Sequence, residues 1–150
     1  MILPGQTIRA IRPHIVTPFN ERQKFRGMSY GLSVAGYDVR IDQDVWLNTG
    51  DFKLGSTIER FEMPYDVLGI VHDKSTWARL GLAVQNTVIE PGWKGYLTVE
   101  LTNHGPHAID IPRGCPIAQI IFHRCEAPVE TPYQGKYQDQ PAKPVPALYE

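Results

Sequence analysis

Two stretches of this 150-residue sequence carry side chains suited to binding anions and moving protons. In the first, Ser75 and Thr76 stand where a helix can begin, so two hydroxyls and free backbone N–H groups meet at its positive end. Lys74 adds a charge beside them, and Arg79 follows Ser75 by four residues, on the same face of a continued turn. The pattern predicts either an anion site or a capped helix with a solvated arginine.

The second stretch, Tyr96–Thr102, alternates between apolar and polar residues. Leu97, Val99 and Leu101 are expected on one face of a strand, and the polar residues between them on the other. Glu100 lies on the polar face. If this face lines a cleft, Glu100 is placed to act as a general base; the alternative is a surface carboxylate that faces water.

Glu90 precedes the second stretch at a predicted chain reversal. Pro91 and Gly92 suit a type II turn, in which glycine takes the position that requires a positive φ. From the residues alone, a turn-capping acid and a site residue are both compatible with Glu90.

The sequence carries no zinc-deaminase signature. Cys115 and Cys125 are the only cysteines, and neither belongs to a Cys-x-x-Cys pair or follows a His-x-Glu motif. His123, Cys125 and Glu126 are close in sequence, but we expect them to flank a strand and not to bind a metal. Both thiols are expected to stay reduced.

Composition narrows the class of protein. A chain of 16.9 kDa forms one domain by the usual prior of about 100–200 residues. The net charge of −1 argues against a dedicated nucleic-acid binder. No apolar run approaches the length of about 18 residues that a membrane span needs, and no signal peptide is recognisable, so a cytoplasmic location is expected.

The elements that position these residues are predicted to be short strands. Thirteen glycines and thirteen prolines divide the chain into pieces too short for many helices. Strand patterns fall at Val45–Leu47, Val67–Val71, Leu82–Gln85, Tyr96–Thr102, Ala108–Ile111 and Ile117–Phe122. Their spacing predicts an all-β sandwich or barrel.

Helical turns are expected in only two places. One is Pro4–Ile11, and the other begins at Ser75 or Thr76 as N-cap and ends at Gly81. Residues 127–150 contain five prolines and little apolar periodicity, which indicates an extended arm. Within it, Tyr133–Gln140 is unusually rich in aromatic and hydrogen-bonding groups.

Taken together, these segments resemble the dCTP deaminase branch of the dUTPase superfamily. The resemblance covers most of residues 29–140 in the family's order, through Ser29–Ser33, Gly36–Arg40, Lys74–Leu82, Val84–Asn103, Pro116–Phe122 and Tyr133–Gln140. It implies a distorted β-barrel or jelly-roll-like core over residues 1–126. It further implies an arm, 127–150, that closes over the nucleotide, and a homotrimer with each site between adjacent subunits.

The resemblance also implies a role for each candidate catalytic residue. Glu100 is similar to the family's general base and proton shuttle. Ser75 and Arg79 are similar to the pair that cooperates with this acid and orients the attacking water. Such donors stabilise developing charge, a contribution that often exceeds the acid–base one.

Further positions resemble the family's nucleotide-binding residues. Lys74 and Thr76 match the phosphate-binding positions beside Ser75. Glu90 stands where the family usually has an Asp that touches the 3′-hydroxyl of the deoxyribose. The remaining matches lie on the arm. Tyr133 matches a residue that packs on the sugar and base, and Lys136 and Gln140 match a triphosphate clamp.

The implied reaction is hydrolytic deamination of dCTP to dUTP and ammonia, without zinc and with Mg²⁺ bound through the triphosphate. A bifunctional enzyme that carries dUTP on to dUMP and diphosphate shares nearly all these motifs. A plain dUTPase typically reads Arg-Ser-Gly where this chain has Lys74-Ser75-Thr76, and it lacks the equivalent of Glu100. A non-catalytic nucleotide-binding trimer is the alternative outside the enzymes.

Two features depart from the family pattern. Glu90 is one methylene longer than the usual Asp. The segment between Arg79 and Glu100 is about two residues shorter than in some bacterial members, which changes the loop Gln85–Val88 on the nucleobase side.

Overall fold

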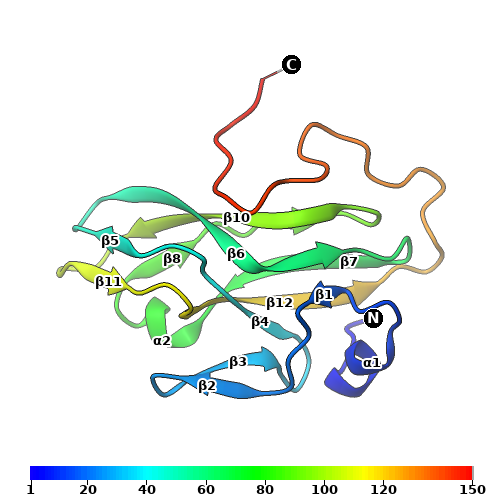
Figure 1. The fold of residues 1–150 in the computed structure, drawn as a ribbon, viewed down its shortest axis with the longest axis horizontal. Helices are drawn as coiled ribbons and strands as arrows, with labels where there is room; N and C mark the ends of the chain where they lie inside the picture. The colour runs from blue at the N-terminus through cyan, green and yellow to red at the C-terminus, as the bar shows by residue number, and fades with distance from the viewer. Residues whose placement is uncertain (150) are drawn as a thin grey trace.

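The computed structural model describes residues 1–149, and nearly all of its regular structure is β (Figure 1). Two short helices, α1 (Gly5–Ala10) and α2 (Ser75–Ala78), accompany the strands. The strands are β1 (Val16–Thr17), β2 (Gln23–Phe25), β3 (Met28–Leu32), β4 (Tyr37–Arg40), β5 (Val45–Leu47), β6 (Phe52–Glu62), β7 (Val67–Asp73), β8 (Leu82–Val84), β9 (Val88–Ile89), β10 (Lys94–Asn103), β11 (Ile109–Ile111) and β12 (Pro116–Arg124). The all-β prediction is confirmed.

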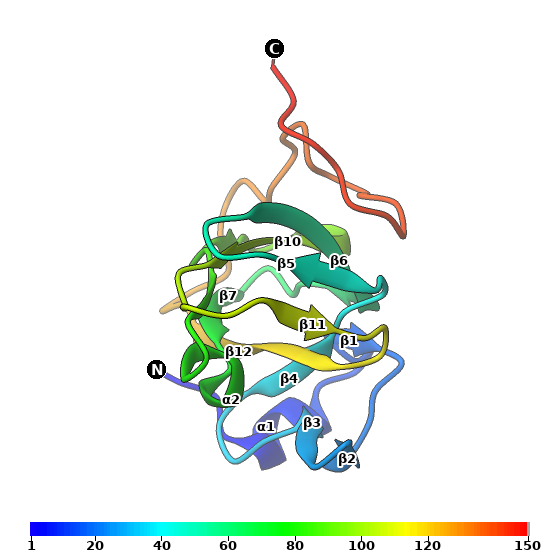
Figure 2. The same ribbon diagram turned by 90° about the vertical axis from the view of Figure 1, so that its left-hand side faces the viewer.

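The strands form three antiparallel sheets that enclose one core. Six strands are ordered β2-β3-β4-β12-β7-β9, four are ordered β1-β6-β10-β8, and β11 pairs with β5. Figures 1 and 2 show β6 and β10 stacked over β7, β12 and β4. Apolar side chains from both layers, among them Phe61, Val71, Leu101 and Ile120, are buried together. Burial of this face fixes the layers relative to each other.

Every strand predicted from the alternation overlaps an observed one, namely β5, β7, β8, β10, β11 and β12. The helix near Ser75 is also present, and Gly81 follows it with φ +96°. Its start was predicted wrongly. The N-cap is Lys74, with no side-chain cap hydrogen bond, because its backbone is extended and the helical bonds begin at its carbonyl.

The longest strand, β6, lacks a clean alternation and was not predicted from the sequence. Its register against β10 shifts, so that three residues of β6, Thr57–Glu59, lie opposite the single residue Leu97. The Thr57 hydroxyl accepts the Leu97 N–H at 3.0 Å and donates to the Glu59 carbonyl at 2.7 Å, which satisfies the backbone at this bulge.

The bulge corrects the predicted alternation of β10. Leu97 was expected on the opposite face from Thr98 and Glu100, yet all three line the same cavity. Leu97 lies opposite the bulge of β6, where the regular pairing of the two strands is interrupted.

The C-terminal segment crosses the outer side of β10 and ends away from the sheets (Figures 1 and 2). Between residue 125 and residue 149 it forms no helix or strand. Neither of the two helices in the described part of the chain has the length and apolar content to span a membrane.

Candidate active site

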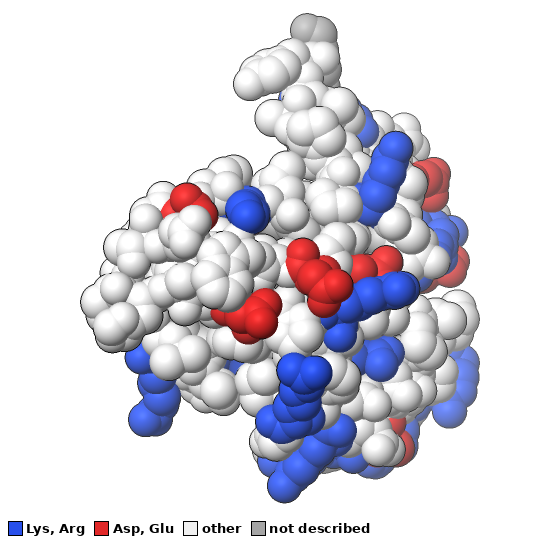
Figure 3. All heavy atoms as spheres, turned by 60° about the vertical axis from the view of Figure 1, so that its left-hand side comes forward, with Lys and Arg blue, Asp and Glu red and all other residues white. Residues whose placement is uncertain are grey.

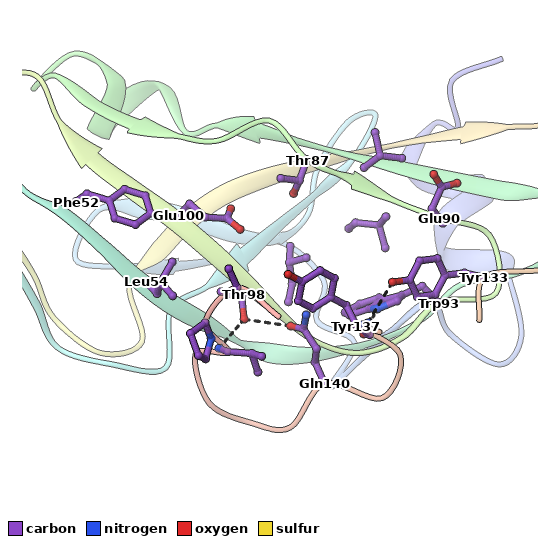
Figure 4. Close-up of a pocket in the computed structure, with 16 residues that line it drawn as sticks. Phe52, Leu54, Thr87, Glu90, Trp93, Thr98, Glu100, Tyr133, Tyr137 and Gln140 are labelled. Carbon is purple, nitrogen blue, oxygen red and sulfur yellow. Dashed lines mark hydrogen bonds between the residues drawn. The ribbon is translucent and has the colours of Figure 1, made fainter. Parts of the chain in front are cut away.

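A cavity of about 560 Å³ lies between strand β10, the turn before it and the C-terminal segment (Figure 4). Glu100, Glu90, Tyr133 and Gln140, four of the predicted site residues, line it. The other lining residues are mostly apolar or aromatic: Phe52, Leu54, Thr87, Val88, Ile89, Trp93, Leu97, Thr98, Tyr137, Val145, Pro146 and Ala147. We call this space the β10 cavity. An apolar pocket with a few convergent polar groups is typical of small-molecule sites.

Glu100 points into the β10 cavity from the middle of its strand. Its Oε2 atom is buried and has no hydrogen-bond partner within residues 1–149. Burial raises the pKa of the Glu100 carboxyl above its ordinary value. An acid whose pKa is moved toward neutrality, with a free lone pair facing a cavity, can accept and return a proton.

Glu90 lies at the other end of the cavity, beside Tyr133 (Figure 4). The predicted type II turn positions it: Gly92 has φ +84°, and the Trp93 N–H donates to the Glu90 carbonyl at 3.1 Å. The two carboxylates therefore occupy opposite ends of one cavity, where they can contact different parts of a single ligand.

The C-terminal segment is held on this turn and on β10 by backbone and side-chain hydrogen bonds. The Trp93 indole donates to the Tyr137 carbonyl at 2.6 Å, and the Gln138 side chain accepts the Lys94 N–H at 2.7 Å. The Tyr96 N–H donates to the Gln140 carbonyl at 3.0 Å. These bonds close one side of the β10 cavity.

Gly95 makes this close approach possible. It has φ +137°, and a Cβ added there would lie 2.6 Å from the Gln140 backbone nitrogen. A side chain at residue 95 would therefore push the segment off the strand.

Lys136 lies outside the β10 cavity. It is exposed, and its ammonium group stands 5.6 Å from the ring centre of Tyr137. Its predicted partner Gln140 lines the cavity instead. In this structure the two residues of the predicted triphosphate clamp therefore face different surroundings.

A second cavity, of about 470 Å³, holds Lys74 and Ser75. Its lining is more polar: Arg22, Ser29, Ser33, Val34, Ala35, Asp38, Asp73, Gln119 and Ile121 complete it. We call it the α2 cavity. Lys74 Nζ lies 3.4 Å from Asp38 Oδ1, and both side chains are about nine-tenths buried. Desolvation raises the pKa of Asp38, although Lys74 opposes the rise.

Thr76 and Arg79 are exposed and line neither cavity. Arg79 stays one turn from Ser75, since its N–H donates to the Ser75 carbonyl at 3.1 Å. The predicted catalytic residues are thus divided within one chain: Glu100 faces the β10 cavity, whereas Ser75 lines the α2 cavity and Arg79 extends from the end of the same helix.

Several lining residues were not singled out from the sequence. Thr87, Thr98 and Trp93 border the β10 cavity, and Asp38 and Gln119 border the α2 cavity. All five fall inside stretches that carry the family resemblance, so the resemblance could have drawn attention to them. The side-chain roles of Thr87, Thr98 and Trp93 also depend on how the C-terminal segment and the loop at Gln85–Val88 pack.

In the His123, Cys125 and Glu126 group, the latter two follow strand β12 as predicted, whereas His123 lies within the strand, opposite Leu68. Within residues 1–149, no group of three or more His, Cys, Asp or Glu side chains is arranged to hold a metal ion. Zinc independence stays a prediction.

Charges of both signs are interspersed on the face of the molecule that Figure 3 shows. Acidic side chains stand among uncharged ones near its middle, and basic side chains gather toward its lower edge. This face offers small local charges and not one continuous basic surface, in agreement with the net charge of −1.

Comparison with known sequences places the chain. The profile of the family described as dCTP deaminase-like matches residues 34–125. The chain belongs to the dCTP deaminase-like family. Curated relatives named dCTP deaminase include one from Campylobacter fetus, 34% identical over 93% of this chain and 93% of the relative. Another, from Acidiphilium cryptum, is 34% identical over 98% of this chain and 99% of the relative.

Solved structures agree on the fold of this dCTP deaminase-like chain. The native EIAV dUTPase aligns with a TM-score of 0.59 and 24% identity, covering 79% of this chain and 94% of that one. A mutant dUTPase from phage phi11 of S. aureus, solved to show how a structural Mg(II) ion is coordinated, aligns with a TM-score of 0.58 and 14% identity, covering 79% and 92%. These likenesses establish the dUTPase fold.

Proposed function

We propose that this protein hydrolyses dCTP to dUTP and ammonia. The observation that carries the proposal is the Glu100 carboxylate, which lines a cavity large enough for a nucleoside, has a raised pKa and has one buried oxygen, Oε2, without a hydrogen-bond partner. The names of the curated relatives, which match nearly the whole chain, support the same reaction.

Deamination requires one group to move several protons. Water must lose one proton as it adds to C4 of cytosine, and N3 must gain one. The new C4 hydroxyl must then lose its proton as the carbonyl forms, and the amino group must gain one to leave as ammonia. A single carboxylate can carry the first proton from water to N3 and the second from the hydroxyl to the amino group, and such catalysis contributes about 10²–10⁴-fold. Glu100 is the carboxylate suited to this work, because Glu90 lies at the far end of the cavity.

We assign Ser75 and Arg79 to the water-orienting role across a subunit boundary. They lie apart from Glu100 in one chain, so the complete site combines the β10 cavity of one subunit with helix α2 of the next. A homotrimer with a site at each interface accounts for this division. The exposed Thr76 and Arg79 side chains are then available to the neighbouring subunit.

The α2 cavity is proposed to receive the phosphates. Lys74 lines it and supplies a positive charge. Thr76, on the adjoining helix α2, is the second residue proposed to bind phosphate. Mg²⁺ would enter with the triphosphate as its counterion, and the oxygen-rich lining suits it, since Asp38 offers a carboxylate to the metal or its waters. Bound in this way, Mg²⁺ would neutralise phosphate charge.

The arm, residues 127–150, is proposed to close over the nucleotide; Glu150 lies outside the described residues. Tyr133 lines the β10 cavity beside Glu90, where a sugar and base can pack on its ring. Lys136 would turn from solvent to the triphosphate when the ligand is bound. The free thiols Cys115 and Cys125 accord with a reducing cytoplasmic location.

The decisive experiment is incubation of the purified protein with dCTP and Mg²⁺, followed by separation of dUTP, dUMP and dCMP and measurement of ammonia. Deaminase activity gives equal amounts of ammonia and dUTP. Ammonia with dUMP and diphosphate identifies the bifunctional alternative. Conversion of added dUTP without ammonia from dCTP identifies a dUTPase, and binding of dCTP without any product identifies a non-catalytic trimer.

A further inference from the structure

The hydroxyl of Thr98 joins strand β10 to two points of the C-terminal segment (Figure 4). It donates to the side-chain oxygen of Gln140 at 3.1 Å and accepts the backbone N–H of Val145 at 3.0 Å. Both hydrogen-bonding functions of the hydroxyl are therefore used, and Thr98 is only 7% exposed. The bonds hold residues 140 and 145 at one point, and the chain between them, with Pro141 and Pro144, forms a short loop.

The residues that follow this loop form part of the wall around Glu100. Val145, Pro146 and Ala147 line the β10 cavity together with Glu100. Thr98 and Glu100 are two residues apart on β10, so their side chains lie on the same face of the strand. One cavity therefore has in its lining both a segment that Thr98 holds in place and a carboxylate whose Oε2 atom is buried.

We propose that Thr98 is a positioning residue, whose hydroxyl holds Val145–Ala147 against the cavity and so keeps water away from the Glu100 carboxylate. The proposal rests on the proposed function, because it assigns Glu100 the protons of the reaction. The proposal gives two parts of the arm different tasks. Tyr133–Gln140 contacts the ligand, and Val145–Ala147 excludes water from Glu100.

Within one subunit, none of residues 1–149 that line the cavity is a cation that could compensate the charge of Glu100. The ionisable groups that share the cavity are Glu90, Tyr133 and Tyr137. On β6 the residue paired with Glu100 is the apolar Leu54, and on the other side the Gln85 N–H donates to the Glu100 carbonyl. Within the subunit, burial is the main influence on the pKa of Glu100, and admitting water lowers that pKa.

The test compares Thr98→Val, which keeps the side-chain shape without the hydroxyl, with Thr98→Ser, which keeps the hydroxyl. Thr102→Val is the matched control: Thr102 lies on the same strand and face, and no hydrogen bond joins it to residues 131–149. A fourth variant ends the chain after Gln140 and so retains Lys136 and Gln140. For each, kcat/KM for dCTP deamination is measured from about pH 4 to about pH 9.

We expect the acid limb of the kcat/KM profile to lie about one pH unit lower in Thr98→Val and in the shortened chain than in the wild type. At pH values on the plateau, the kcat of both variants should also be lower. Thr98→Ser and Thr102→Val should retain the wild-type limb. A limb that does not move in Thr98→Val, or that moves equally in Thr98→Ser, overturns the proposal. A change in KM alone also overturns the proposal, because it would show that Thr98 acts only in ligand binding.

A second measurement does not need turnover. The difference in unfolding free energy between the protein with Glu100 and its Glu100→Gln variant is followed against pH, in the wild-type and in the Thr98→Val background. We expect the pH range of this difference to shift down by about one unit in the second background. If the wild type releases no ammonia, the proposed function fails, and this measurement still decides the role of Thr98.

Discussion

The Arg79 N–H donates to the Ser75 carbonyl at 3.1 Å, so one helical turn holds both side chains on one face, away from the cavity that contains Glu100. A rigid pair on one element and a carboxylate on another require a second subunit if they are to act on one substrate. The arrangement can therefore be tested by mixing subunits.

We expect Glu100→Gln and Arg79→Ala to be inactive separately and active together. When the two variants are unfolded, mixed equally and refolded, about a quarter of the interfaces of a trimer combine an intact Glu100 with an intact neighbouring Arg79. Deaminase activity should recover to about that fraction of wild type. A mixture as inactive as its components would place the whole site within one chain.

Glu100→Gln alone should lose about 10²–10⁴-fold in kcat while it still binds dCTP. The amide keeps the shape of the side chain but cannot accept a proton. Binding is measured by calorimetry and turnover by ammonia release. Near-normal ammonia release would remove Glu100 from the role of general base.

The raised pKa of Glu100 also predicts how stability depends on pH. A carboxyl whose pKa is raised in the folded state stabilises that state fully when the pH is below the pKa of the unfolded state. This contribution is lost as the pH rises through the folded-state pKa. Glu100→Gln should therefore match the wild type near pH 4 and become relatively more stable as the pH rises to about 7. Urea unfolding across this range measures the difference, and a constant difference contradicts the prediction.

Deletion of Tyr133–Glu150 should leave a folded core and weaken dCTP binding. The buried apolar cluster lies before residue 126, whereas the deleted residues contribute Tyr133 to its edge. Loss of hydrogen bonds to a charged ligand should raise KM about ten- to a hundredfold, with less discrimination between dCTP and dCMP. The shortened chain should still unfold cooperatively; unchanged kinetics would show that the segment has no part in the reaction.

Glu90 should determine where the reaction stops. Release of diphosphate from dUTP needs a water placed near the α-phosphate, and an additional methylene and rotatable bond in the carboxylate loosen such placement, which costs about a hundredfold. Released dUTP is therefore expected as the main product, and Glu90→Asp should increase dUMP. Product chromatography measures the ratio. Equal ammonia and diphosphate from the wild type, with no free dUTP, would contradict this view.

Local features of the site were predictable because they depend on residues close in sequence. The Pro91-Gly92 turn, the Ser75–Arg79 spacing and the strand that carries Glu100 each follow from patterns a few residues long. The family resemblance then assigned roles to these positions. The bulge at Thr57–Glu59 had no such pattern, so the turning of Leu97 toward the cavity could not be foreseen.

The sequence by itself determined which residues can do the chemistry: a lone carboxylate on a strand, a hydroxyl and an arginine one helical turn apart, and a proline-rich arm with aromatic and amide groups. Only the tertiary structure decided how they are grouped. The bonds that close the β10 cavity join residues more than 40 positions apart, as Trp93 to Tyr137 and Thr98 to Val145 do. Such pairs meet only after the sheets have stacked, because no short-range preference of the backbone encodes them. The cavity around Glu100 is therefore a property of the packed arm and strand, and it arises with the fold.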